Sequence, residues 1–152
     1  MSDNQPGAAS QEQQFAVQRI YVKDISFEVP LGAKVFTKQV QPQLKIDLNT
    51  KADRIDGDVF EAVLSITVSA KVGEETAFLI EVQQAGAFLI KGFDSEQLRR
   101  LLMITCANVL FPYARETIDS LATRGSFPPL MLQPVNFEAL YLQSQQQQAS
   151  QH

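Results

Sequence analysis

Apolar and polar residues alternate along several parts of the chain, which is the pattern of β-strands that bury one face. The most extended of these stretches is 76–92. One side of its first half is apolar except for a glutamine: Phe78, Ile80, Val82 and Gln84. The other side mixes apolar and polar side chains: Leu79, Glu81 and Gln83. Because successive strand side chains point to opposite faces, we predict one buried face and one contact surface.

Three further stretches have the strand pattern. The first, 15–29, changes the phase of its alternation twice, which predicts a β-bulge or a shift of sheet partner. The second, 44–49, precedes a polar segment, 49–58, that we expect to form a loop. The third, 60–70, alternates without interruption. Short connections join antiparallel neighbours, so the sequence predicts an α+β fold whose four-stranded antiparallel sheet has one wet face.

After Gly92 the apolar period changes from that of a strand to that of a helix. Asp94 can cap this helix, with Gln97 completing a capping box. The helix carries a broad apolar stripe: Leu98, Leu101, Leu102, Thr105, Val109 and Leu110. Such a stripe is too wide for a helix with one face in water, so another element must cover it. We expect Pro112 to kink or split the helix, because its ring removes a backbone donor.

The helical pattern stops at Arg124 and Gly125, a basic last turn followed by a favoured C-terminal glycine. The segment 125–134 is apolar for a loop, and its three prolines keep it extended. Asn136 can then cap a short C-terminal helix.

Both ends of the chain are polar. The first 14 residues and the glutamine-rich stretch 143–152 contain too little apolar surface to offset their ordering entropy. We expect both to be disordered tails, with the folded domain at 15–142.

Composition restricts the possible functions. A chain of 152 residues with 45% hydrophobic residues has the size and core of one soluble domain. Its net charge of −4 disfavours phosphate backbones, so a nucleic-acid partner is not expected. The start lacks a signal peptide, no apolar run is long enough to enter a membrane, and the single cysteine suits a reducing compartment. We therefore predict a cytoplasmic protein that does not insert into membranes.

Catalytic chemistry has little support in the sequence. The only histidine is His152, and Cys106 lies in an apolar helix, where a thiol is normally a small buried hydrophobe. No cluster has the spacing of metal ligands or of a phosphate-binding loop, so we expect no enzyme, cofactor or metal. Asp24 and Glu28 share one strand face and are either a solvated face or an acidic docking surface.

Four long segments, in this order, make the chain similar to the SecB family of protein-export chaperones. These are R-I-Y-V-K-D-I-S-F-E-V-P (19–30), G-E-E-T-A-F-L-I-E-V-Q-Q-A-G (73–86), N-V-L-F-P-Y-A-R-E (108–116) and R-G-S-F-P-P-L-M-L-Q-P-V-N-F-E-A-L (124–140). The resemblance implies a homotetramer, a dimer of dimers with helices layered between two sheets. It also implies that the protein holds new precursors in a non-native state without ATP and delivers them to the SecA motor.

The resemblance further implies roles for single residues. The positions expected to bind SecA are Asp24, Glu28, Leu79 and Glu81. Those expected to join the dimers are Phe78, Ile80, Val82 and Gln84. Because unfolded clients have apolar side chains to bury, we expect a client groove of apolar residues. Its candidates are Tyr21, Val40, Leu44, Phe127, Leu130, Met131, Phe137 and Tyr141.

Two alternatives stay open. A SecB-like chaperone could serve a single partner, such as the antitoxin of a toxin–antitoxin pair. A small α+β protein could instead bind a small ligand in a pocket lined by Tyr21, Phe27 and an acid.

Overall fold

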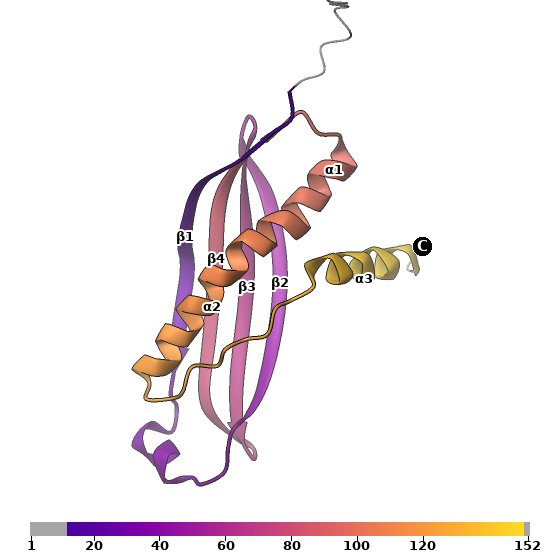
Figure 1. Ribbon diagram of the computed structural model, residues 1–152. Coiled ribbons are helices and arrows are strands. Elements are labelled where there is room, and N and C mark those ends of the chain that lie inside the picture. The colour runs from indigo at the N-terminus through magenta and orange to yellow at the C-terminus, as the bar shows by residue number, and fades with distance from the viewer. Residues whose placement is uncertain (1–11, 151–152) are drawn as a thin grey trace, which may run out of the picture.

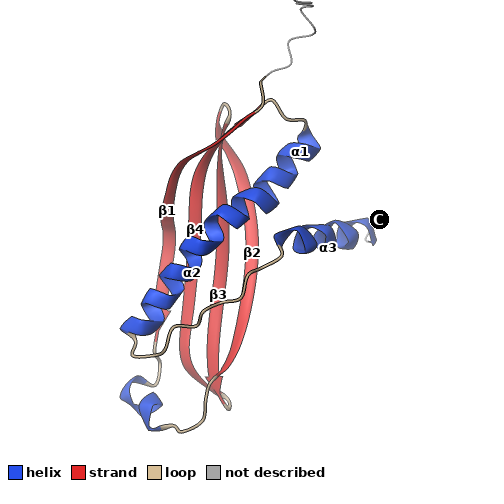
Figure 2. Ribbon diagram, viewed as in Figure 1, coloured by secondary structure: helices blue, strands red, loops and turns tan. Residues whose placement is uncertain are grey.

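The computed structural model describes residues 12–150 and consists of one antiparallel sheet with helices on one face (Figures 1 and 2). Four strands form the sheet in the order β1-β4-β3-β2. Their bounds are β1 Gln14–Glu28, β2 Gln43–Asp56, β3 Val59–Val72 and β4 Glu75–Lys91. The helical elements are the 3-10 helix η1 Gly32–Thr37, α1 Ser95–Arg100, the π-helical turn η2 Leu101–Thr105, α2 Cys106–Arg124 and α3 Phe137–Ser150. This confirms the predicted α+β fold of the subunit.

β1 contains two irregularities in its pairing with β4. The register shifts between Val17 and Arg19 and again between Val22 and Asp24. Each shift inserts one extra residue, so the side chains after it point to the face opposite to the one that regular alternation would give. As a result, the apolar residues on both sides of each bulge all pair with β4 positions of one face: Phe15, Val17, Ile20, Val22, Ile25 and Phe27. The predicted bulge is confirmed.

The prediction of a loop over 49–58 was wrong. β2 continues to Asp56, and only Gly57 and Asp58 separate it from β3. Pairing with β3 overrides the low strand propensity of this polar segment, since Lys51, Ala52 and Arg54 all have cross-strand partners. The Arg54 guanidinium also donates to the Gly57 carbonyl and lies 4.6 Å from the centre of the Phe60 ring.

The long helix begins as predicted. Asp94 accepts a hydrogen bond from the Gln97 amide at 2.8 Å, and the Gln97 side chain accepts one from the Asp94 amide, which completes the capping box. The backbone stays helical through η2, where the Cys106 amide donates to the Leu101 carbonyl. The helix also continues through Pro112, so the chain is not split there. The irregular turn lies before the proline.

α2 crosses the sheet and buries a row of residues four apart: Cys106, Leu110, Ala114, Ile118 and Ala122. Ala107 and Phe111 are buried next to this row. Each of these packs in one core with the inward face of β3 and β4. The sheet therefore covers one side of the broad apolar stripe. The other side, including Leu101, Leu102 and Ile104, is only half-buried in the single chain.

The C-terminal segment differs in part from expectation. Asn136 caps α3 by accepting a hydrogen bond from the Ala139 amide at 3.0 Å, as predicted. The helix, however, extends to Ser150 and includes most of the stretch expected to be disordered. Glutamine is a good helix former, and Gln145 donates to the Tyr141 hydroxyl at 2.8 Å. In the predicted N-terminal tail, residues 1–11 lie outside the described residues, and Gln14 already belongs to β1. At the other end of the chain, Gln151 and His152 also lie outside the described residues.

Candidate functional site

The sheet has two faces of different character. The helix face is covered by α1, η2 and α2, and the loop 125–136 also crosses it (Figures 1 and 2). The open face is the opposite one, and no helix among residues 12–150 lies on it. The candidate site residues divide between these two faces.

The four residues expected to bind SecA lie together on the open face. Ser26 of β1 pairs with Glu81 of β4, and Glu28 pairs with Leu79. Asp24 lies two residues before Ser26 on the same face, opposite Gln83. The Ser26 hydroxyl donates to the Glu81 carboxylate at 3.4 Å. We call Asp24, Glu28, Leu79 and Glu81 the acidic strip.

A hydrogen-bonded cluster lies beside the acidic strip on the open face. Glu61 of β3 accepts hydrogen bonds from the Tyr21 hydroxyl and, at 2.7 Å, from the Lys23 ammonium group. Because β4 lies between β1 and β3, the cluster connects two strands that are not neighbours. The hydrogen bonds from Lys23 and Tyr21 lower the pKa of Glu61 below its usual 4.5. Burial and the Glu61 carboxylate raise the pKa of Tyr21 from 10.0 to about 12.

The residues expected to join the dimers lie on the helix face. Phe78, Ile80, Val82 and Gln84 are at most 3% exposed in the single chain. The three apolar residues pack in the core beneath α2. The Gln84 amide donates to the Tyr21 carbonyl at 3.1 Å, and Gln84 accepts from Thr117 of α2 at 3.4 Å. These four side chains therefore hold α2 and β1 in place and present no exposed surface to another subunit.

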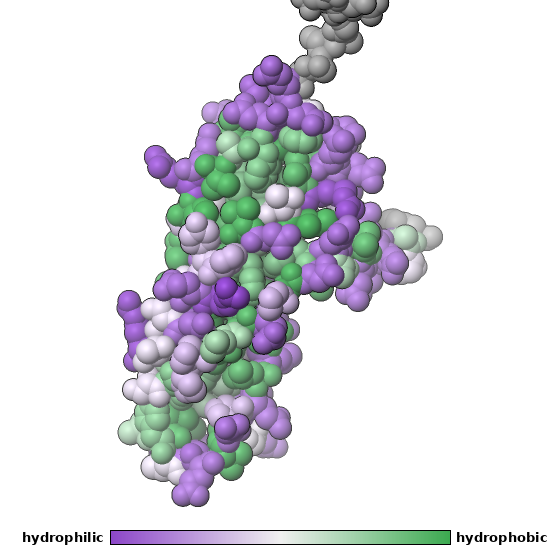
Figure 3. Space-filling view, in the orientation of Figure 1, coloured by the Kyte–Doolittle hydropathy of each residue, from purple (hydrophilic) through white to green (hydrophobic). Residues whose placement is uncertain are grey.

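The loop 125–136 meets η1 at one end of the helix face. The Phe127 ring lies 4.5 Å from the Phe78 ring and 5.6 Å from the Phe36 ring, measured between centroids. Phe36 is exposed, and apolar surface is visible at this end of the molecule (Figure 3). Sequence reasoning missed Phe36, although an aromatic residue in the short segment after Gly32 was a usable signal.

The structure does not gather the client-groove candidates into one groove. Tyr21 lies on the open face, away from the other seven. Val40, Leu44 and Met131 are exposed, whereas Phe127 and Leu130 are half-buried beside the core. Phe137 and Tyr141 are buried where α3 joins the body. Apolar side chains are buried by default, and an exposed pattern could not be read from their identity alone.

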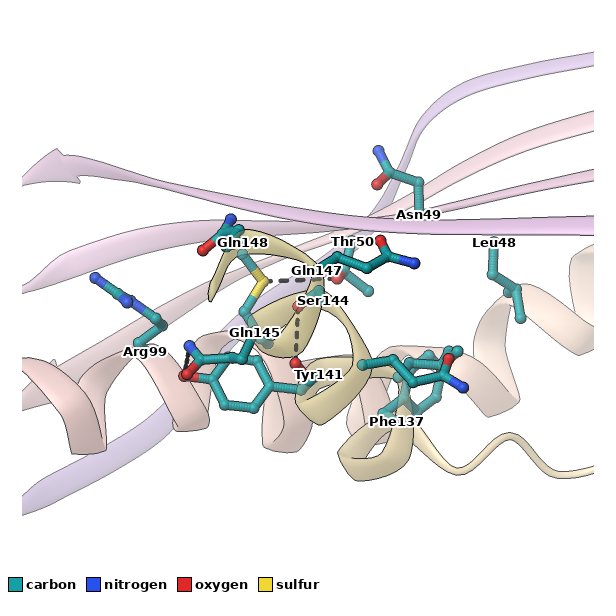
Figure 4. A pocket seen from close by; sticks show the side chains of 13 residues that line it. Leu48, Asn49, Thr50, Arg99, Phe137, Tyr141, Ser144, Gln145, Gln147 and Gln148 are labelled. Atoms are coloured by element: carbon teal, nitrogen blue, oxygen red, sulfur yellow. Dashed lines mark hydrogen bonds between the residues drawn. The ribbon is translucent and has the colours of Figure 1, made fainter. Parts of the chain in front are cut away.

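A cavity of about 630 Å³ lies between α3, η2 and β2 (Figure 4). Phe137 and Tyr141 contribute to its wall, but half of the α3 residues around it are glutamines. In the close view Thr50 points toward α3, and its hydroxyl donates to the Met103 sulfur at 3.5 Å. The cavity is thus polar and differs from the apolar groove expected for clients.

The small-ligand pocket expected at Tyr21 and Phe27 is not formed. Tyr21 lies on the open face, and Phe27 lies on the helix face with its ring 6.3 Å from that of Phe78. Residues on opposite faces of a strand cannot line one pocket. Their spacing of six residues would place both on one face of a regular strand, but the register shift near Lys23 puts them on opposite faces.

Cys106 is fully buried, and this burial raises the pKa of its thiol to about 12. It is an inert core residue, as expected. Residues 12–150 contain no group of three or more metal-ligating side chains. None of the helices in this range combines the length and apolar character needed to cross a bilayer.

The family model described as preprotein translocase subunit SecB matches residues 8–148. The chain belongs to the SecB family. Protein-export protein SecB of Pseudomonas fluorescens strain Pf0-1 is 54% identical over 149 residues, covering 96% of this chain and 92% of the relative. The SecB of Ectopseudomonas mendocina is 55% identical over 139 residues, covering 91% and 86%. The resemblance drawn from the sequence is confirmed.

The SecB fold is also found among solved structures. A SecB-like chaperone of Mycobacterium tuberculosis, in complex with a peptide from an antitoxin, matches with a TM-score of 0.67. The match covers 80% of this chain and 90% of that chain, at 20% identity. At this identity the likeness supports the fold, a four-stranded sheet with its long helix.

Proposed function

We propose that this chain holds newly made precursor proteins in a non-native state without ATP and delivers them to SecA, as a cytoplasmic homotetramer. The role in protein export follows from its membership of the SecB family. The observation that carries the finer proposal is the separation of two surfaces. The acidic strip lies on the open face, and most of the exposed apolar candidates lie away from it.

Client binding is supported by exposed apolar side chains in η1, around the start of β2 and in the loop 125–136. Phe36, Val40, Leu44, Ile46 and Met131 are all exposed. β2 is also an edge strand, so its outer backbone groups can pair with an extended chain. Apolar contact with backbone pairing suits clients of varied sequence, because the backbone is common to all of them.

SecA binding is supported by the acidic strip. Glu28 and Glu81 are exposed and lie on neighbouring strands around the half-buried Leu79. A basic segment of the partner would find two carboxylates and an apolar contact within one patch. Such complementarity speeds encounter and weakens as salt rises.

Self-association is supported by apolar surface along the β1 edge of the helix face. Val17, Val22 and Ile25 of β1 and Tyr113 of α2 are exposed in the single chain. The half-buried residues of η2 add to this surface. We propose that the dimer-joining role expected of the four buried β4 residues is indirect, through the position of α2. These residues are Phe78, Ile80, Val82 and Gln84.

Light scattering tests the proposed assembly and activity together. The purified chain is measured alone, with an unfolded, slowly refolding precursor, and with the same precursor after folding. We expect a mass near four subunits, which rises with the unfolded precursor and not with the folded one. A monomer that ignores the unfolded precursor would contradict the proposal.

A second candidate is a chaperone dedicated to one antitoxin, because the SecB-like structural relative was solved with an antitoxin peptide. The same light-scattering assay distinguishes the two. Binding of several unrelated precursors favours export, and failure with all of them but success with one antitoxin favours the dedicated role.

A further inference from the structure

The loop 125–136 carries no charged residue and has prolines at 128, 129 and 134. Proline has no backbone N–H, so Leu130 and Met131 supply the first amide donors after the proline pair. Leu132 is buried, Leu130 is half-buried, and Met131 is 70% exposed. The loop therefore leaves the core at one residue and returns to it at the next.

One carboxylate of α2 holds this part of the loop. The Leu130 amide donates to Asp119 Oδ1 at 2.9 Å, and the Met131 amide donates to the same oxygen at 3.1 Å. Hydrogen bonds to an ionised carboxylate are stronger than those between neutral groups. Asp119 is itself on a rigid helix, and the Thr123 hydroxyl donates to its backbone carbonyl at 2.8 Å.

The backbone of Met131 is in an uncommon conformation. Its φ is +52°, in the left-handed region that non-glycine residues other than asparagine and aspartate rarely adopt. Such a conformation persists only where surrounding contacts hold it. The Met131 amide donates one of the two hydrogen bonds to Asp119 and the preceding Leu130 amide donates the other, so Asp119 holds the backbone at this position.

We infer that Asp119 is a positioning residue that anchors the loop and holds Met131 outward as a contact for clients. This inference rests on the proposed client binding. A methionine side chain is flexible and polarisable, so it adapts to clients of different shape. Phe127 lies near the start of the same loop, where its ring packs between those of Phe36 and Phe78. These contacts hold the loop at a second point.

The test compares Asp119→Ala and Asp119→Asn with Glu116→Ala. Glu116 is an exposed acid one turn earlier on the same helix and lies in the same surface depression, so it matches the charge change without touching the loop. Amide hydrogen exchange at Leu130 and Met131 reports the anchor directly. Client affinity is measured with a labelled, permanently unfolded precursor.

For Asp119→Ala we expect about tenfold faster exchange at these two amides and about tenfold weaker client binding, with smaller changes for Asp119→Asn. Glu116→Ala should match the wild type in both. Unchanged exchange in Asp119→Ala would overturn the anchor. Faster exchange with unchanged client affinity would overturn the role in client binding.

Met131→Gly separates the backbone from the side chain. Glycine adopts positive φ without strain, so the two amides should stay protected while client affinity falls. Equal affinity in this variant would overturn the contact assigned to Met131. If the wild type binds no unfolded precursor, the proposed function itself fails, although the exchange result still decides whether Asp119 anchors the loop.

Discussion

At the residue scale, a few polar side chains connect elements that the backbone leaves apart. Glu61 ties β1 to β3 across β4 through Tyr21 and Lys23. Gln84 of β4 connects β1 to α2, because its side chain donates to the Tyr21 carbonyl and accepts from the Thr117 hydroxyl. Each link is made by a residue whose partners are far away in the sequence, so each has its role only in the folded chain.

The Glu61 cluster predicts a pH-dependent contribution to stability. Because the folded-state pKa of Glu61 is lowered, the contribution is present above pH 4.5 and is lost as the pH falls through the folded value. We expect Glu61→Gln to lower the free energy of unfolding by about 1 kcal/mol at pH 7, since Lys23 is partly exposed. Urea unfolding should show this difference shrinking in acid.

The same variant should change the alkaline titration. Tyr21, with a pKa of about 12, favours the folded state below pH 10, and this contribution is lost as the pH rises through 12. Glu61→Gln should lower the pKa of Tyr21, as followed by ultraviolet absorbance. Glu96→Gln, which removes an exposed acid of α1 on the other face of the sheet, is the control and should leave the titration unchanged. For the acid side, a difference in unfolding free energy between Glu61→Gln and the wild type that is equal at neutral and acid pH would contradict the role given to the Glu61 carboxylate.

At the element scale, α2 tolerates a residue that normally breaks helices. Pro112 is exposed, and so is Asn108, whose carbonyl would have received the missing hydrogen bond. Water can therefore satisfy that carbonyl. The burial of every fourth residue against the sheet supplies enough packing to keep the helix continuous.

Replacing Pro112 tests this balance. We expect Pro112→Ala to raise the free energy of unfolding by about 1–3 kcal/mol, because alanine restores the backbone donor and has high helix propensity. Thermal and urea unfolding measure the change. Glu116→Pro, at another exposed position of α2, should instead destabilise by about 3 kcal/mol. A less stable Pro112→Ala protein would mean that the ring sets the path of the helix.

At the scale of the whole molecule, the sheet separates two proposed binding functions. The acidic strip occupies the open face near β1 and β4, while the client candidates Val40, Leu44 and Met131 lie elsewhere. A chaperone that transfers its cargo benefits from this arrangement, because the partner can bind without competing with the client.

Charge reversal tests the separation. We expect Glu81→Arg to weaken SecA binding about tenfold and to leave client capture intact, because the basic partner would meet a like charge. The difference from the wild type should decrease at high salt. Asp53→Arg makes the same change on the open face of β2 and should have little effect. Simultaneous loss of both activities would show that the two surfaces are not separate.

The sequence by itself determined the elements whose signals are local. Alternation at 60–70 and 76–92, the capping box at Asp94 and the cap at Asn136 need only neighbouring residues, and the structure contains all of them. The family was also readable from the sequence, because several long segments occur in the right order. The strands and caps depend on residues within a few positions of each other, and the family assignment depends on residue identities that need no knowledge of the fold.

Tertiary structure alone decided the rest. The pairing with β3 extends β2 through a polar segment. The sequence predicted a bulge in β1, but only the pairing with β4 places the two register shifts and thereby puts Tyr21 and Phe27 on opposite faces. The sequence predicted a buried face for Phe78 and Ile80, but only the structure identifies α2 as the element that covers them and Asp119 as the residue that holds the backbone at Met131. Burial and register depend on partners distant in sequence, and alternation along one strand does not identify those partners.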